Sequence, residues 1–168
     1  NKLDLVVVNQ GSNNLSVLLG KGDGTFNAAV NYAAGAAPFG ITVGDFNNDA
    51  KLDVIVSNPG GASVNLLLGN GNGTFGAPTS APAGNRPFGL ASADVNGDGK
   101  RDLLVANQAT DPVANLTGDN VVGVLLGNGN GTFAAPVKFA VGTSPFALAV
   151  GDFNLDGKLD IAAGNAQG

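Results

Sequence analysis

The chain contains no cysteine, histidine, methionine or tryptophan, and all 13 of its acidic residues are aspartates. Without cysteine there is no disulfide framework and no thiolate site. Without histidine or cysteine, neither a Ser-His-Asp triad nor a Cys-His pair can be built. Catalysis by paired carboxylates would have to use aspartates of the repeated acidic loops described below, or Asp23, Asp111 and Asp119, which lie in predicted loops without a partner pattern. We therefore expect that this chain is not an enzyme.

Positive charge is also scarce. The eight lysines and arginines are scattered, and the net charge is −5, so there is no electrostatic footprint for nucleic acid. No apolar run is long enough to span a bilayer, and we expect no membrane insertion. Helix-forming residues are few, whereas glycine accounts for 27 of the 168 residues. This composition favours many short strands joined by tight turns, and it predicts an all-β fold.

Three motifs recur along the chain in the same order. The first is LLGKGDGTF or LLGNGNGTF, the second is PFG or PFA, and the third is an acidic stretch such as GDFNLDGKLD. The first motif ends at Phe26, Phe75 and Phe133, so the intervals are 49 and 58 residues. The nine extra residues fall in the segment 109–120, which we interpret as a lengthened loop between two strands. Self-similarity at this period is typical of repeat architectures.

Each repeat is predicted to contain four short strands. In the second copy these cover residues 39–46, 53–58 and 63–70, followed by a weaker strand that runs to about Ala83. The strand 53–58 is continuously apolar, which predicts burial on both faces. Four strands in about 49 residues are typical of a β-propeller blade. The chain is then one repeat domain (1–168) with a partial blade (1–38), a blade (39–87), a blade with the inserted loop (88–145) and a partial blade (146–168).

The stretch VGDFNNDAKLDVIVSN followed by SVNLLLGNGNGTF resembles the FG-GAP/VCBS repeats, the blades of integrin-like β-propellers. The resemblance covers essentially the whole chain in three copies. It implies one calcium ion in the loop between the first and second strands of each blade. It also implies an extracellular setting, since such repeats occur in adhesion proteins, secreted lectins, and accessory domains of bacterial surface proteins and hydrolases.

The spacing of oxygen side chains in the acidic stretches agrees with this implication. Calcium takes six to eight oxygen ligands, and a loop with carboxylates and amides at alternate positions can supply them. The alternative is that Asp, Asn and Gly only form Asx-turns, but four matched positions that recur three times weigh against it. We number each loop from its first aspartate, so that ligands fall at positions one, three, five and nine, and the lysine at position seven lends its backbone carbonyl while its ammonium group points to solvent. The resulting candidate ligands are Asp45, Asn47, Asp49, Lys51 and Asp53; Asp94, Asn96, Asp98, Lys100 and Asp102; and Asp152, Asn154, Asp156, Lys158 and Asp160.

Position six distinguishes the three loops. It is Ala50 in the first loop but Gly99 and Gly157 in the other two. If that position requires a positive φ, alanine costs on the order of 1 kcal/mol there, so we expect the first site to be the weakest. The first residues of the chain match the end of an acidic loop, which places Asp4 at position nine of a fourth, incomplete loop.

The expected function is binding rather than catalysis. We predict a secreted or cell-surface calcium-binding module, with about three structural calcium ions, that offers an adhesion or scaffold surface to a protein partner. A carbohydrate-binding lectin is the alternative. Eight of the nine phenylalanines recur at repeated positions, which indicates core packing. Only Tyr32 and Phe139, in the fourth strands of their blades, are left as candidate sugar-stacking rings.

Two expectations concern the ends and the surface of the chain. Propellers need four or more blades, so the sequence is either a segment of a longer chain with about seven blades, or a piece that assembles with further copies of itself into a ring or filament. Four triplets match the glycosylation pattern, and they begin at Asn14, Asn72, Asn115 and Asn130.

Overall fold

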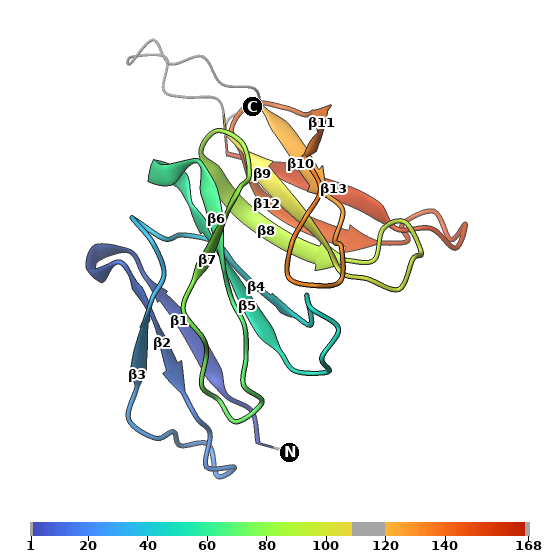
Figure 1. Cartoon of the computed structure of the whole chain (residues 1–168). Helices are drawn as coiled ribbons and strands as arrows, with labels where there is room; N and C mark the ends of the chain where they lie inside the picture. The colour runs from blue at the N-terminus through green and yellow to red at the C-terminus, as the bar shows by residue number, and fades with distance from the viewer. Residues whose placement is uncertain (1, 109–119, 167–168) are drawn as a thin grey trace.

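The computed structural model describes residues 2–108 and 120–166, and in this part of the chain it is all-β. Thirteen strands in the described residues form four antiparallel sheets of three, four, four and two strands. The sheets follow one another in chain order across the molecule, from the blue N-terminal sheet to the red C-terminal pair (Figure 1). The prediction of an all-β fold is confirmed. The described strands do not close into a ring, so a complete β-propeller stays a prediction.

The two central sheets each contain four strands that pair with their neighbours in sequence. Every strand range predicted for the second repeat contains a strand of the structure, as the bounds of its sheet show. The bounds are β4 (Ile41–Gly44), β5 (Asp53–Asn58), β6 (Ser63–Leu67) and β7 (Thr79–Pro82) in one sheet, and β8 (Pro87–Ala93), β9 (Asp102–Asn107), β10 (Val121–Leu125) and β11 (Val137–Ala140) in the other.

The outer sheets contain subsets of the same four-strand pattern. At the N-terminal end, β1 (Leu5–Asn9), β2 (Asn14–Leu18) and β3 (Val30–Ala33) correspond to the second, third and fourth strands of a central sheet. At the C-terminal end, β12 (Pro145–Gly151) and β13 (Asp160–Asn165) correspond to the first and second strands. Two short 3₁₀ turns, η1 (Gln10–Ser12) and η2 (Pro59–Gly61), join the second and third strands of the first two sheets.

The hydrophobic core lies between successive sheets. Every residue of β5 and β9 is buried, which confirms the predicted burial of the second strand on both faces. One buried cluster joins Ile55 and Leu66 to Leu103 and Leu125 across the two central sheets. A second cluster, which includes Leu15 and Val56, joins the first sheet to the second. The repeats therefore stack through their apolar faces, as repeat units that share a core do.

Small residues allow the first strands of neighbouring sheets to approach closely. A Cβ atom on Gly40 would collide with the carbonyl oxygen of Phe88, and one on Gly89 would collide with the carbonyl oxygen of Phe146. Only glycine removes that atom without moving the backbone. This explains the glycine of the PFG motif in the first two copies.

The predicted core packing of the repeated phenylalanines is correct only in part. Phe46 is 2% exposed and lies in the core, whereas Phe153 is 60% exposed. The three phenylalanines of the PFG and PFA motifs are partly exposed and pack on one another, with ring centroids 5.0, 5.1 and 5.8 Å apart. They lie where the first strands begin, so neighbouring copies of the same residue cover them rather than a sheet face.

Candidate metal centre

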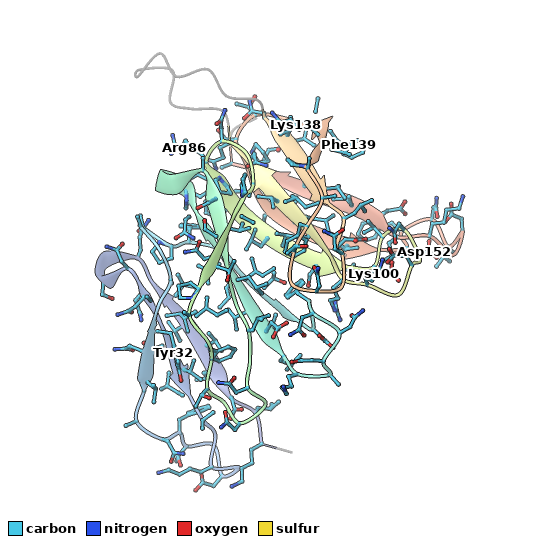
Figure 2. The ribbon with its side chains drawn as sticks, in the orientation of Figure 1. Tyr32, Arg86, Lys100, Lys138, Phe139 and Asp152 are labelled. Atoms are coloured by element: carbon cyan, nitrogen blue, oxygen red, sulfur yellow. The ribbon has the colours of Figure 1, made fainter. Side chains whose placement is uncertain are left out.

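The three acidic loops connect the first and second strands of their sheets, as predicted. The first acidic loop (residues 45–53) joins β4 to β5, the second (94–102) joins β8 to β9, and the third (152–160) joins β12 to β13. The second and third loops project from the same end of their strands, where Lys100 and Asp152 are labelled (Figure 2). The repeat therefore presents its acidic side chains at one end of the stacked sheets.

The side chains at positions one and three converge on one point in every loop. Asp45 Oδ1 and Asn47 Oδ1 both accept a hydrogen bond from the amide of Asp49, at 3.2 and 3.1 Å. The corresponding amides of Asp98 and Asp156 are each held by the equivalent pair of oxygens at 3.0–3.1 Å. The two oxygens thus share one N–H donor, as in an Asx-turn, and the ion site itself stays a prediction.

The second carboxylate oxygen at position one holds the amide of position six. The distance is 2.8 Å in all three loops, to Ala50, Gly99 and Gly157 respectively. These three residues have φ angles of 62°, 79° and 84°. The expectation that position six requires a left-handed backbone is therefore confirmed, and Ala50 carries the steric cost that glycine avoids.

Position four is also left-handed, and sequence reasoning missed it. Its φ is 60° at Asn48, 76° at Gly97 and 63° at Leu155. Asparagine and glycine tolerate this region, whereas a bulky leucine rarely occupies it. The third loop is therefore strained at Leu155, much as the first loop is strained at Ala50. The second loop has glycine at both positions, and Gly97 was the available signal.

The aspartate at position nine differs from the others because it is buried and binds backbone. Asp53 has no exposed surface; its Oδ2 accepts from the amide of Phe46 at 2.9 Å and its Oδ1 from the amide of Gly69 at 2.8 Å. Asp102 makes the same two bonds to Val95 and Gly127. This residue joins the start of its loop to the end of the third strand.

In each outer sheet the position-nine aspartate makes one of these two bonds. Asp4 Oδ1 accepts from the amide of Gly20 at 2.8 Å, and Asp160 Oδ2 accepts from the amide of Phe153 at 3.0 Å. The assignment of Asp4 to position nine of an incomplete loop agrees with this bond. Gly20, Gly69 and Gly127 donate their amides to position-nine aspartates, whereas the sequence alone indicated only that these glycines lie near turns.

The lysines at position seven lie at the surface, and two of them also pair with the aspartate at position five. Lys51 Nζ lies 3.1 Å from Asp49 Oδ2, and Lys100 Nζ lies 3.2 Å from Asp98 Oδ2. Positions five and seven lie close together on the loop surface, where opposite charges attract. In the third loop, Asp156 Oδ2 instead accepts a bond from the side-chain amide of Asn154 at 3.3 Å.

Electrostatics within the first two loops follow from these contacts. Burial raises the pKa of Asp53, and the charges of Asp49 and Asp45 raise it further, against the lowering effect of its two amide bonds. The side chain of Lys51 lowers the pKa of Asp49. The backbone amide and the side chain of Lys100 lower the pKa of Asp98. The pKa of Asp53 therefore depends on the charges of the two other carboxylates of its loop, Asp45 and Asp49.

The residues fit a calcium ion by their chemistry. All candidate side-chain ligands offer oxygen, which is what calcium binds, and those at positions one and three lie close enough together to share one N–H donor. Within residues 2–108 and 120–166, however, no three acidic side chains lie close enough together to hold a metal ion. The carboxylate at position five instead binds the side chain of a lysine or an asparagine, and the carboxylate at position nine binds backbone amides.

Tandem antiparallel sheets with a repeated acidic loop define a β-repeat protein. A family model for the FG-GAP-like repeat matches residues 1–56, 45–105 and 110–163, and a second model for the FG-GAP repeat matches residues 87–125. The chain belongs to the FG-GAP repeat family. A search among curated proteins found no match. In the described part of the chain, no helix is long and apolar enough to cross a membrane.

The two candidate sugar-stacking rings differ in their surroundings. Tyr32, on β3, packs edge-on against Phe75 with centroids 5.6 Å apart. Phe139, on β11, is 54% exposed (Figure 2). The corresponding strand β7 contains no aromatic residue. Of these two candidate rings only Phe139 is exposed, so β3, β7 and β11 do not present a repeated stacking platform.

The glycosylation triplets also fall in different environments. Asn14 lies in β2, and its side-chain oxygen accepts bonds from Asn9 and Ser12. Asn72 and Asn130 lie in exposed turns, where each side-chain oxygen accepts from the following threonine. Asn115 lies outside the described residues.

Proposed function

We propose that this chain is an extracellular calcium-binding repeat module whose sheets are blades of a β-propeller, and that it serves as an adhesion or scaffold surface for a protein partner. The observation that carries the proposal is that all three acidic loops arrange their side-chain oxygens in the same way. In all three, the oxygens at positions one and three converge on the amide of position five. In a member of this family, oxygen side chains at alternate positions of a loop that recurs three times support a calcium site.

The residues that would hold the ions are those at positions one, three, five and nine, with the backbone carbonyl of position seven. In the first loop these are Asp45, Asn47, Asp49, Asp53 and Lys51, and the equivalent residues serve in the other two. When bound, each ion supplies two positive charges, and three ions would change the net charge from −5 to about +1. The carboxylates of each loop repel one another without them.

The chain's own part in this function is mechanical. The acidic loop is the connection between the first and second strands, and position nine ties it to the end of the third strand through Asp53 and Gly69 or Asp102 and Gly127. An ordered loop therefore fixes three of the four strands of a sheet relative to one another. The proposed role of calcium is to stabilise this connection rather than to promote a reaction.

The experiment is a calcium titration combined with thermal unfolding. Isothermal titration calorimetry should find about three calcium sites per chain, and magnesium serves as the matched control ion. A single site filled at a hundred times its Kd stabilises by about 2.7 kcal/mol, which raises Tm by roughly 5–10 °C for a chain of this size. An unchanged Tm after chelation with EGTA would show that calcium does not stabilise the fold.

The proposed extracellular setting follows from the same chemistry. Weak loop sites fill at the millimolar calcium found outside cells and stay empty in the cytosol. The proposed blades comprise residues 39–87 and 88–145, with partial blades 1–38 and 146–168 on either side. Further blades would come from the rest of a longer chain or from other copies. The intact mass of the denatured polypeptide, compared with 16.5 kDa for these residues, distinguishes the two sources.

A lectin is the second candidate function, and the exposed ring of Phe139 favours it. Sugars stack on exposed aromatic rings, and Phe139 lies near the end of β11 (Figure 2). No aromatic residue stands on β7, so the site is not repeated. A glycan array with wild type and Phe139→Ala tests it, because loss of a glycan signal in the variant alone would support a lectin.

A further inference from the structure

The first acidic loop touches the sheet that follows it as well as its own sheet. The turn at residues 127–133 connects β10 toward β11, and its Gly131 amide donates a hydrogen bond of 2.9 Å to the carbonyl oxygen of Phe46. The rings of Phe46 and Phe133 meet edge-on, with centroids 5.9 Å apart. Position two of the loop is thus held from the neighbouring sheet by a backbone bond and an aromatic contact.

Phe46 links the loop to the core between the two central sheets. Its side chain is 2% exposed and belongs to the buried cluster that includes Leu103 and Leu125. Its amide is bound by Asp53, the position-nine residue of the same loop. Phe153 is its counterpart in the third loop. No equivalent turn packs on it in the described residues, and it is 60% exposed.

The backbone of the turn is shaped to admit the loop. A Cβ atom on Gly129 would lie 2.8 Å from Asn48 Nδ2, so the end of the Asn48 side chain lies against the backbone of the turn. Gly129 has a φ of 74° and Gly131 a φ of 80°, so both also need the conformational freedom of glycine. Positions two and four of the acidic loop therefore both contact the turn of the next sheet.

We propose that the turn 127–133 regulates ion binding in the first acidic loop, so that calcium at residues 45–53 and the junction between the two central sheets stabilise each other. This inference rests on the proposed calcium function. The turn supplies no ligand; it positions the loop through the backbone bond and ring contact at Phe46, and it lies against the side chain of Asn48. Coupling between two events is reciprocal in binding free energy, so a weaker junction must lower calcium affinity and an empty loop must loosen the junction.

The test compares Phe133→Ala with the matched variant Phe75→Ala in the whole chain. Phe75 occupies the equivalent turn of the sheet that contains the first loop, and it packs on Tyr32 of the preceding sheet. Calcium is titrated into ¹⁵N-labelled protein, and the amides of Ala50, Gly99 and Gly157 report the three loops separately. Each of these amides is bound by the position-one aspartate of its loop.

We expect the Ala50 midpoint in Phe133→Ala to move to about five-fold higher calcium or more, the lower end of typical coupling strengths. In Phe75→Ala the Ala50 midpoint should move less, because the turn of Phe75 contacts the first loop only within its own sheet. An Ala50 midpoint that is the same in a folded Phe133→Ala and in wild type would overturn the coupling while leaving calcium binding intact. If no amide shifts in wild type at millimolar calcium, the proposed function itself fails, and the coupling fails with it.

A second measurement covers the case in which Phe133→Ala does not fold. Amide hydrogen exchange at Gly131 is followed in wild type and in Asp45→Asn, with Asp152→Asn as the matched control. Calcium should slow exchange at Gly131 in wild type and in the control, but not in Asp45→Asn. Equal protection in the two variants would show that the ion of the first loop does not act on the turn.

Discussion

Asp53 Oδ1 accepts a hydrogen bond of 2.8 Å from the amide of Gly69, and this bond joins the end of the first acidic loop to the end of β6. The other oxygen of Asp53 binds the amide of Phe46. One buried carboxylate thus ties together the start of its loop, the start of β5 and the end of the third strand. Asp102 repeats the arrangement with Gly127 and Val95.

The first prediction concerns this residue. Asp53→Asn should lower the free energy of unfolding by about 1–3 kcal/mol, since the side-chain amide cannot accept both bonds and leaves one buried N–H without a partner. Urea unfolding in EGTA measures the effect without any contribution from calcium. Asp4→Asn is the control, because Asp4 is exposed and makes one such bond. Equal losses in the two variants would contradict the role given to burial.

The second prediction concerns backbone strain at position six. Ala50→Gly should stabilise the protein by about 0.5–1 kcal/mol, because glycine adopts the observed φ of 62° without a steric cost. The reverse change at the same position of the second loop, Gly99→Ala, should destabilise by about 1 kcal/mol. Both are measured by urea unfolding in EGTA. A loss of stability in Ala50→Gly would show that alanine is not strained there.

The extent to which the sequence predicted these features depends on how local each one is. The strand pattern, the buried β5 and the shared focus of Asp45 and Asn47 follow from residues close together in the chain. The bond between Asp53 and Gly69 spans 16 residues and depends on how the strands pair. Leu155 carries no propensity for a left-handed backbone, so its φ of 63° could not be anticipated.

The exposure of the aromatic rings could not be anticipated either. Phe46 and Phe153 occupy the same position of their loops, yet one is buried and the other is 60% exposed. The difference is made by the turn of the following sheet, which contacts Phe46 through Gly131 and Phe133. A periodic motif shows which residues are equivalent, but a neighbouring repeat decides which of them is covered.

The third prediction ranks the loops by their strain. The first loop is strained at Ala50 and the third at Leu155, whereas the second has glycine at both left-handed positions. Calcium affinity falls by the part of this strain that an ion-free loop can relax, so the second loop, which carries none, should bind calcium most tightly. The amide of Gly99 should therefore reach its midpoint at lower calcium than those of Ala50 and Gly157. The opposite order would mean that ligand identity outweighs backbone strain.

Leu155→Asn tests this ranking within one loop. Leu155 is 88% exposed, so the change removes little packing, and asparagine tolerates the left-handed region. The variant should shift the Gly157 midpoint to lower calcium and leave that of Gly99 unchanged. An unaltered Gly157 midpoint would show that position four does not limit the third site.

The last prediction concerns the lysines at position seven. Lys51 is paired with Asp49 at 3.1 Å, and calcium binding at Asp49 competes with this pair. Exposed ion pairs are worth about 0.2–1 kcal/mol, so Lys51→Met should raise the calcium affinity of the first loop by roughly 1.5- to 5-fold. The gain should shrink at high salt, which already weakens the pair.

Lys158→Met is the matched control for Lys51→Met, because Asp156 Oδ2 in the third loop accepts its bond from Asn154 instead. Both variants remove one positive charge at position seven, so a general effect of charge on calcium affinity is the same in both. Only Lys51→Met also releases a carboxylate from an ion pair. The shift of the Ala50 midpoint in Lys51→Met should therefore exceed that of the Gly157 midpoint in Lys158→Met. Equal shifts would mean that net charge alone, and not competition for Asp49, sets the effect of the lysine.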